Sequence, residues 1–211
     1  MKISILYDNT VCNPDLTPDW GFACLVEADG HTLLFDTGAK GGLLIGNLDK
    51  LGISPSIIDT VFLSHNHWDH IGGLHDFLSI QPATVVAPAT CPVPSRAKNI
   101  ITVKDPVQID DNIYSTGSLD DFEQSLVIRQ DNRSVVVVGC SHPGVGRIMN
   151  AASRYGKMGA LIGGLHGFCD FSLLETLDAV CPVHCTQQIG EIKRRFPNKY
   201  LEGGAGRMLV F

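Results

Sequence analysis

Hydrophobic and polar residues repeat along this chain with two different periods, and these periods predict its elements. Short apolar runs predict strands at residues 2–7, 22–28, 32–36, 60–64 and 84–87, and again at 134–139 and 159–164. Apolar positions three and four residues apart predict helices at 41–51, 74–78, 145–152 and 187–196. Strands and helices therefore alternate on both sides of a proline-rich, then strand-like middle segment, residues 88–130.

The alternation indicates an α/β protein with mixed sheets and helices on their outer faces. Ser172 and Glu175 have the spacing of a capping box, which predicts one more helix starting there. No low-complexity tract, charge block or short repeat marks a linker. We therefore expect one domain over residues 1–211.

Composition narrows the possible functions. The 211 residues are 44% hydrophobic and 18% charged, which is typical of a compact core, and the net charge of −6 gives no basic field for nucleic acid. No run approaches the ~20 apolar residues of a membrane span, so no membrane association is expected. The apolar run near the first residue is too short for a secretory signal, so a cytoplasmic location is expected. The seven cysteines form no C-x-x-C pair, so a reducing compartment is expected. A small-molecule substrate remains as the expected partner.

The candidate chemistry lies in the stretch LSHNHWDHIGGL, residues 63–74. If the preceding strand stays extended through it, His65, His67 and Asp69 point the same way, because side chains alternate along a strand. Gly72 allows a sharp turn that brings His70 toward a second centre. Imidazole and carboxylate at this spacing predict two neighbouring metal sites.

Further ligands must come from distant segments, because one strand end cannot surround an ion. His142, His166 and His184 each follow a short apolar run, and ligands gather at the carboxyl ends of strands in open α/β sheets. Alone, each fits a structural histidine; together with the cluster, the ligand interpretation is favoured. His31 and His75 have no such placement and are expected on the surface or in a helix.

These motifs resemble the metallo-β-lactamase superfamily, whose signature is H-x-H-x-D-H followed by later histidines. The stretches WGFACLVEADGHTLLFDTG, VVVVGCSHPG, IGGLHG and PVHCT are most similar to the branch of dihydropterin ribofuranosylaminobenzene phosphate synthase-like hydrolases. The resemblance implies a four-layer αββα sandwich. It also implies one metal on His65, His67 and His142, and a second metal on Asp69, His70 and His184.

The resemblance also implies that Asp36 orients a metal ligand, while its place before Thr37 and Gly38 equally suits a helix N-cap. Imidazole and carboxylate ligands make zinc the default for both divalent ions, with iron or manganese as alternatives. Cys140 and Cys185 flank ligand histidines. We expect them to face away from the site and do not count them as ligands.

Two adjacent divalent ions would hold a hydroxide and polarise a substrate oxygen, with Asp69 orienting that hydroxide and moving its proton. The sequence therefore predicts a metal-dependent hydrolase of a phosphoester or other ester-type small molecule. The alternatives are a transferase that displaces pyrophosphate in pterin-type cofactor synthesis, a mononuclear iron oxidoreductase, and a metal-binding protein without turnover. Arg96 and Lys98 are candidate phosphate contacts or, equally, a solvated loop.

His166 marks a departure from the superfamily pattern. Many dinuclear relatives carry at this place an aspartate that bridges both metals, and an imidazole nitrogen has one lone pair and cannot bridge. We therefore expect His166 to line the site as a side ligand or as a catalytic contact to a substrate oxygen. The alternative is a structural histidine in a glycine-rich turn.

Overall fold

The computed structural model describes all residues 1–211 and contains two mixed sheets. The first has the order β13-β1-β2-β3-β4-β5-β6. Its strands are β1 (Lys2–Tyr7), β2 (Ala23–Ala28), β3 (His31–Phe35), β4 (Thr60–Phe62), β5 (Thr84–Pro88), β6 (Asn99–Val103) and β13 (Met208–Val210). Strands β3 to β6 run parallel to one another, and β13, β1, β2 and β3 pair antiparallel.

The second sheet has the order β12-β11-β10-β9-β8-β7. Its strands are β7 (Val107–Asp110), β8 (Ile113–Ser115), β9 (Leu126–Gln130), β10 (Arg133–Val138), β11 (Lys157–Gly164) and β12 (Ala179–Val183). Strands β10, β11 and β12 are parallel. The middle segment therefore supplies β6 to β9. Of these strands, β6 forms an edge of the first sheet and β7 forms an edge of the second.

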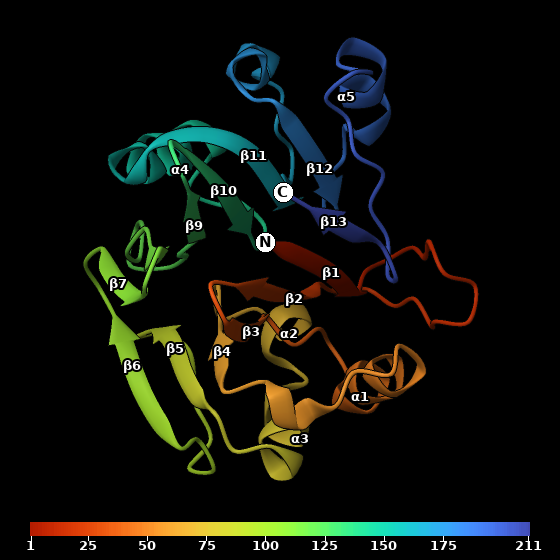
Figure 1. The fold of residues 1–211 in the computed structure, drawn as a ribbon, viewed down its shortest axis with the longest axis vertical. Helices are drawn as coiled ribbons and strands as arrows, with labels where there is room; N and C mark the ends of the chain where they lie inside the picture. Colours follow the sequence, from red (N-terminus) through yellow and green to blue (C-terminus); the bar gives the residue numbers. More distant parts are fainter.

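The helices cover the outer faces of the sheets, with α1 and α3 on the lower side and α4 and α5 on the upper side of Figure 1. The α-helices are α1 (Gly41–Lys50), α2 (Trp68–Ile71), α3 (Leu74–Ile80), α4 (Val145–Ala152) and α5 (Ile189–Arg195). The short 3₁₀ helices are η1 (Pro55–Ile57), η2 (Ser153–Tyr155) and η3 (Phe171–Thr176). None of these helices has the length and apolar character that a membrane crossing requires.

Strand alternation builds three apolar layers. In β3, Leu33 and Phe35 belong to the core between the sheets, whereas Leu34 belongs to the cluster under α1 and α3. In β10, Val137 likewise faces the central core and Val138 faces the cluster under α4. The central strands of both sheets are thus buried on both faces, which is why they are continuous apolar runs, whereas the edge strands β6 and β7 are only partly buried. The predicted αββα sandwich is confirmed.

Two local expectations are wrong. The segment after Asp170 forms the 3₁₀ helix η3 without a capping box, because the Ser172 hydroxyl donates to the Asp170 carboxylate at 2.7 Å instead of capping a backbone N–H. The extended chain after β4 ends before Asp69, since α2 begins at Trp68. Asp69 is therefore aimed by a helical turn and not by strand alternation.

Candidate metal centre

The candidate centre lies where parallel strands of both sheets end. His65 follows β4 of the first sheet, while His142, His166 and His184 follow β10, β11 and β12 of the second. Gln124, just before β9 of the second sheet, binds the segment after β4 of the first: its backbone N–H donates to the Ser64 carbonyl at 2.9 Å and its side-chain amide to the Leu63 carbonyl at 2.8 Å. The predicted gathering of these histidines at one edge is thus seen in the structure.

Three imidazoles form what we call the first ligand set: His65, His67 and His142. Their ring centroids are 4.6 Å apart for His65 and His67, and 4.8 Å apart for each of the other two pairs. Nε2 of His65 and Nδ1 of His67 approach to 3.0 Å. Two nitrogens on one zinc ion lie roughly 3.3 Å apart, given Zn–N bonds of about 2.0–2.1 Å, so this spacing fits a shared ion.

The second ligand set is Asp69, His70 and His184. The rings of His70 and His184 lie 4.9 Å apart, and Asp69 Oδ2 lies 3.4 Å from His184 Nε2. Trp20 Nε1 donates to the same carboxylate oxygen at 2.8 Å and fixes its position. The sets are adjacent, since the rings of His65 and His70 are 4.3 Å apart.

Buried carboxylates hold two of the ligand rings from outside. Asp36 Oδ2 lies 2.7 Å from Nδ1 of His70, and Glu123 Oε2 lies 2.9 Å from Nδ1 of His142. An acceptor on Nδ1 places the proton there and leaves Nε2 free as a metal ligand. The N-cap of α1 is Lys40, so Asp36 is no helix cap, and its contact with His70 supports the orienting role.

Neutral oxygen atoms hold two further rings in the same way. Nδ1 of His65 lies 2.9 Å from the Ser64 hydroxyl, which itself donates to Asp36. Nδ1 of His184 lies 3.1 Å from the Asn9 side-chain oxygen, which also accepts from the Gly21 backbone N–H. In all four rings the outward nitrogen is satisfied by oxygen and Nε2 is left for the interior.

A buried nitrogen atom of His184 shows whether these residues fit a metal ion. His184 is 6% exposed, and its Nε2 has no hydrogen-bond partner. A buried ring nitrogen without a partner costs free energy, whereas a metal ion would satisfy it. This nitrogen faces Asp69 and His70, both of which offer lone pairs. The donor chemistry therefore fits a divalent ion.

The protonation states of the buried side chains also suit metal binding. Burial lowers the pKa of His65 to about 2 and that of His70 to about 3, so both rings stay neutral with lone pairs available. Burial would raise the pKa of Glu123, but hydrogen bonds from the His142 ring and from the backbone N–H groups of His142 and Ser141 bring it to about 2. The hydrogen bond between Glu123 and the His142 ring also raises the pKa of His142, so the neutral rings are those of His65 and His70.

Glu123 and Asn9 were missed by sequence reasoning. Glu123 is 1% exposed and accepts from the backbone N–H groups of Cys140, Ser141 and His142. The surrounding sequence DDFEQS is typical of an ordinary acidic loop, so no local sequence signal identifies Glu123 as a contact of a ligand. Asn9 had one available signal, because it closely follows a predicted strand as the ligand histidines do.

Replacing Glu123 with glutamine is expected to loosen the first ligand set. The glutamine NH₂ would face backbone N–H donors in either orientation, those of Cys140 and Ser141 or that of His142, so the segment that carries His142 loses part of its anchor. Metal affinity should fall by the roughly 10- to 100-fold typical of outer partners of metal ligands. A competitive chelator titration measures this, with the exposed Glu175→Gln as the control. Equal affinity in both variants would contradict the orienting role.

His166 lies at the rim and belongs to neither set. Its side chain is exposed, and its ring lies 5.2 Å from that of His142. It lines a pocket of about 500 Å³ between the loops 141–147 and 165–170. Arg96 and Lys98 are exposed and do not line this pocket, so the structure offers them no substrate contact there.

The position of Cys140 contradicts the sequence-based expectation. Its Sγ lies 3.2 Å from Nε2 of His70 and within 4.8 Å of ring nitrogens of His65, His142 and His184. Strand β10 ends at Val138 and Ser141 has a positive φ of 62°, so the alternation on which that expectation rests does not extend to Cys140. Cys185 belongs to neither group of candidate ligands, and its Sγ lies 3.9 Å from the Cys140 carbonyl oxygen.

Comparison with known proteins supports the same fold. Residues 16–94 match the family model of the metallo-beta-lactamase superfamily. A curated relative, 7,8-dihydropterin-6-methyl-4-(beta-D-ribofuranosyl)-aminobenzene-5'-phosphate synthase of Methanocaldococcus jannaschii, is 24% identical, with 92% of each chain covered. The predicted similarity to this superfamily and branch is thereby confirmed.

Solved structures agree with this match. A metal-dependent hydrolase of the beta-lactamase superfamily superposes with a TM-score of 0.82 at 23% identity, covering 100% of this chain and 99% of the other. Zn²⁺-bound PqqB from Methylobacterium extorquens has a TM-score of 0.66 at 13% identity, covering 100% of both chains. At these identities the similarity concerns the fold.

Proposed function

Because the chain has the metallo-β-lactamase fold and its residues 16–94 match the model of that superfamily, we propose that it is a metal-dependent hydrolase of phosphoester or other ester-type small molecules. The observation that carries the proposal is the inward orientation of the ligand rings, four of which have Nδ1 held by oxygen. Such outer contacts are typical of metal ligands.

The two ligand sets would hold two divalent ions. Imidazole and carboxylate donors suit zinc and also iron or manganese. When bound, such ions supply activation of a water molecule and stabilise charge on a phosphoryl or carbonyl oxygen.

The chain's own residues would orient the reaction. Trp20 fixes one oxygen of Asp69, so that this carboxylate is positioned to orient the attacking water and receive its proton. Phe122 packs against all three rings of the first ligand set, at centroid distances of 5.3–5.5 Å, and excludes water from that side.

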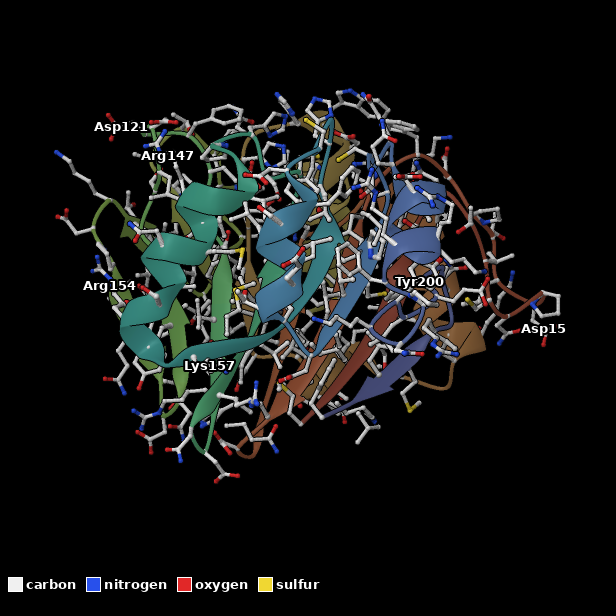
Figure 2. The ribbon with its side chains drawn as sticks, turned by 90° about the horizontal axis from the view of Figure 1, so that it is seen from above. Asp15, Asp121, Arg147, Arg154, Lys157 and Tyr200 are labelled. Carbon is white, nitrogen blue, oxygen red and sulfur yellow. The ribbon has the colours of Figure 1, made fainter.

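The pocket beside His142 and His166 is the proposed substrate site. Helix α4 begins in its wall, and the positive end of a helix favours an anionic group such as phosphate. Arg147, at the same end of α4, forms an ion pair with Asp120 at 2.6 Å, and Figure 2 shows it at the edge of the molecule near Asp121. A phosphorylated small molecule suits these surroundings.

The test is metal analysis of protein purified without added metal, together with rates on phosphomonoester, phosphodiester, carboxyl ester and lactone substrates. We expect two divalent ions per chain and turnover that a chelator removes and metal restores. Protein without bound metal, or metal-loaded protein inactive on every substrate, would contradict the proposal. A single iron with oxygen uptake would favour the oxidoreductase.

The second candidate is a transferase that displaces pyrophosphate. The observation favouring it is the 24% identity over 92% of the chain to a protein named as a synthase. The same ligand sets could bind the leaving pyrophosphate. Release of pyrophosphate from a pterin-methyl diphosphate, dependent on an aromatic amine acceptor, would separate this activity from hydrolysis.

Replacing His166 with alanine is expected to lower turnover of a phosphoester roughly tenfold, the loss of about one substrate hydrogen bond. Metal content should stay at the parental level, because His166 lies in neither ligand set. Rates and metal content are measured on the same preparation. His31→Ala, remote in the structure and paired with Asp110, is the control. An unchanged rate would leave His166 a structural histidine.

A further inference from the structure

Cys140 lies between the two ligand sets. Its Sγ and ring nitrogens of His65 and His142 all lie within 4.8 Å of one another, and the same holds for Sγ with ring nitrogens of His70 and His184. No other residue belongs to both groups. The side chain is 4% exposed, so its contacts are with the protein interior.

A buried cysteine is usually a small apolar residue, but the surroundings of Cys140 do not fit that use. Its Sγ faces ring nitrogens, with His70 Nε2 at 3.2 Å. His184 Nε2, which belongs to the same group, is buried and has no hydrogen-bond partner. Since Nδ1 of both rings is held from outside, both Nε2 atoms are directed toward the space that Sγ also faces.

Charge gives a reason for a thiolate at this place. As metal ligands the imidazoles of the first set are neutral, and the second set brings one carboxylate, Asp69. Two divalent ions held close together repel, and a shared anion between them offsets that repulsion. His166 cannot be that anion, because imidazole has one lone pair per nitrogen. A thiolate sulfur carries several lone pairs and is negatively charged.

We propose that Cys140 is a metal ligand of this chain, bound as a thiolate and shared between the two metal positions, an assignment that rests on the proposed metal centre. Binding breaks the S–H bond of Cys140, forms the metal–sulfur bond and releases the proton to solvent. A thiolate makes the centre selective for zinc, iron or cobalt over magnesium and manganese, which prefer oxygen ligands.

X-ray absorption of the zinc-loaded protein tests the assignment without a variant. We expect a sulfur shell at about 2.3 Å beside nitrogen and oxygen at about 2.0–2.2 Å. Zinc surrounded by nitrogen and oxygen alone would overturn the thiolate and leave the proposed hydrolase standing. A chain that binds no zinc would overturn both.

Variants then identify the sulfur. Cobalt-loaded protein should show a thiolate-to-cobalt charge-transfer band in the near ultraviolet as well as ligand-field bands in the visible. Cys140→Ser should lose the first and keep visible bands from the first ligand set, whereas Cys185→Ser, the matched control, should keep both. Charge transfer that survives in Cys140→Ser, or disappears in Cys185→Ser, would overturn the assignment. If Cys140→Ser does not fold, the sulfur shell in zinc-loaded Cys185→Ser decides the question.

Discussion

Alanine in place of His67 is expected to abolish turnover while the fold remains. His67 is exposed and makes no contribution to the three apolar cores, so its removal costs little stability. Its Nδ1 faces His65 Nε2 at 3.0 Å, which makes it one of three rings around the first metal position. Loss of that ion removes several kcal/mol of transition-state stabilisation, or about three orders of magnitude in rate.

The measurement combines metal content per chain, kcat/KM on a phosphoester, and circular dichroism of the metal-free protein. His75→Ala is the matched control, because His75 is an exposed histidine on α3 outside both ligand sets. We expect this control to keep metal and rate. Unchanged metal content in His67→Ala would refute the first ligand set.

Asparagine in place of Asp69 is expected to reduce the rate by about 10²–10⁴-fold, the range for a positioned acid–base group. The amide keeps the shape of the side chain but loses the negative charge of the second ligand set. It also has to keep its oxygen toward Trp20 Nε1, which donates at 2.8 Å, so its NH₂ group cannot take that place. The second metal should bind more weakly as a result.

Trp20→Phe provides the comparison that separates charge from positioning. It removes the hydrogen bond to Asp69 and leaves the carboxylate in place, so we expect a loss of roughly tenfold or less. Rates and metal stoichiometry are measured for both variants. Near-parental activity with full metal content in Asp69→Asn would rule out the role of this carboxylate.

The candidate ligands could be selected from the sequence because the signal is local. His65, His67, Asp69 and His70 occur within six residues, directly after an apolar strand. Parallel strands bring their carboxyl ends to one edge, so short apolar runs ahead of His142 and His184 were enough to predict that they gather there. Even so, Asp69 is aimed by the first turn of α2, a change of backbone that the assumption of a continuous strand missed.

The outer contacts of the ligands were not predictable in the same way. Glu123 reaches His142 from a loop before β9 that Gln124 ties to the other sheet. Asn9 reaches His184 from the end of β1, and these two residues are 175 positions apart. Such contacts depend on how the two sheets pack against each other. The local sequence of a loop does not indicate which side chains it will contact.

The sequence by itself determined the alternation of strands and helices, the burial of the central strands and the choice of the clustered candidate ligands, because period and spacing act within a single element. Only the tertiary structure decided which oxygen atoms hold the rings and that Cys140 lies between the two ligand sets. Alternation tells which side of a strand a residue occupies, but the groups across that space come from other strands. Their approach is set by the packing of the two sheets against each other, in which the core between them fixes the distance between strand ends.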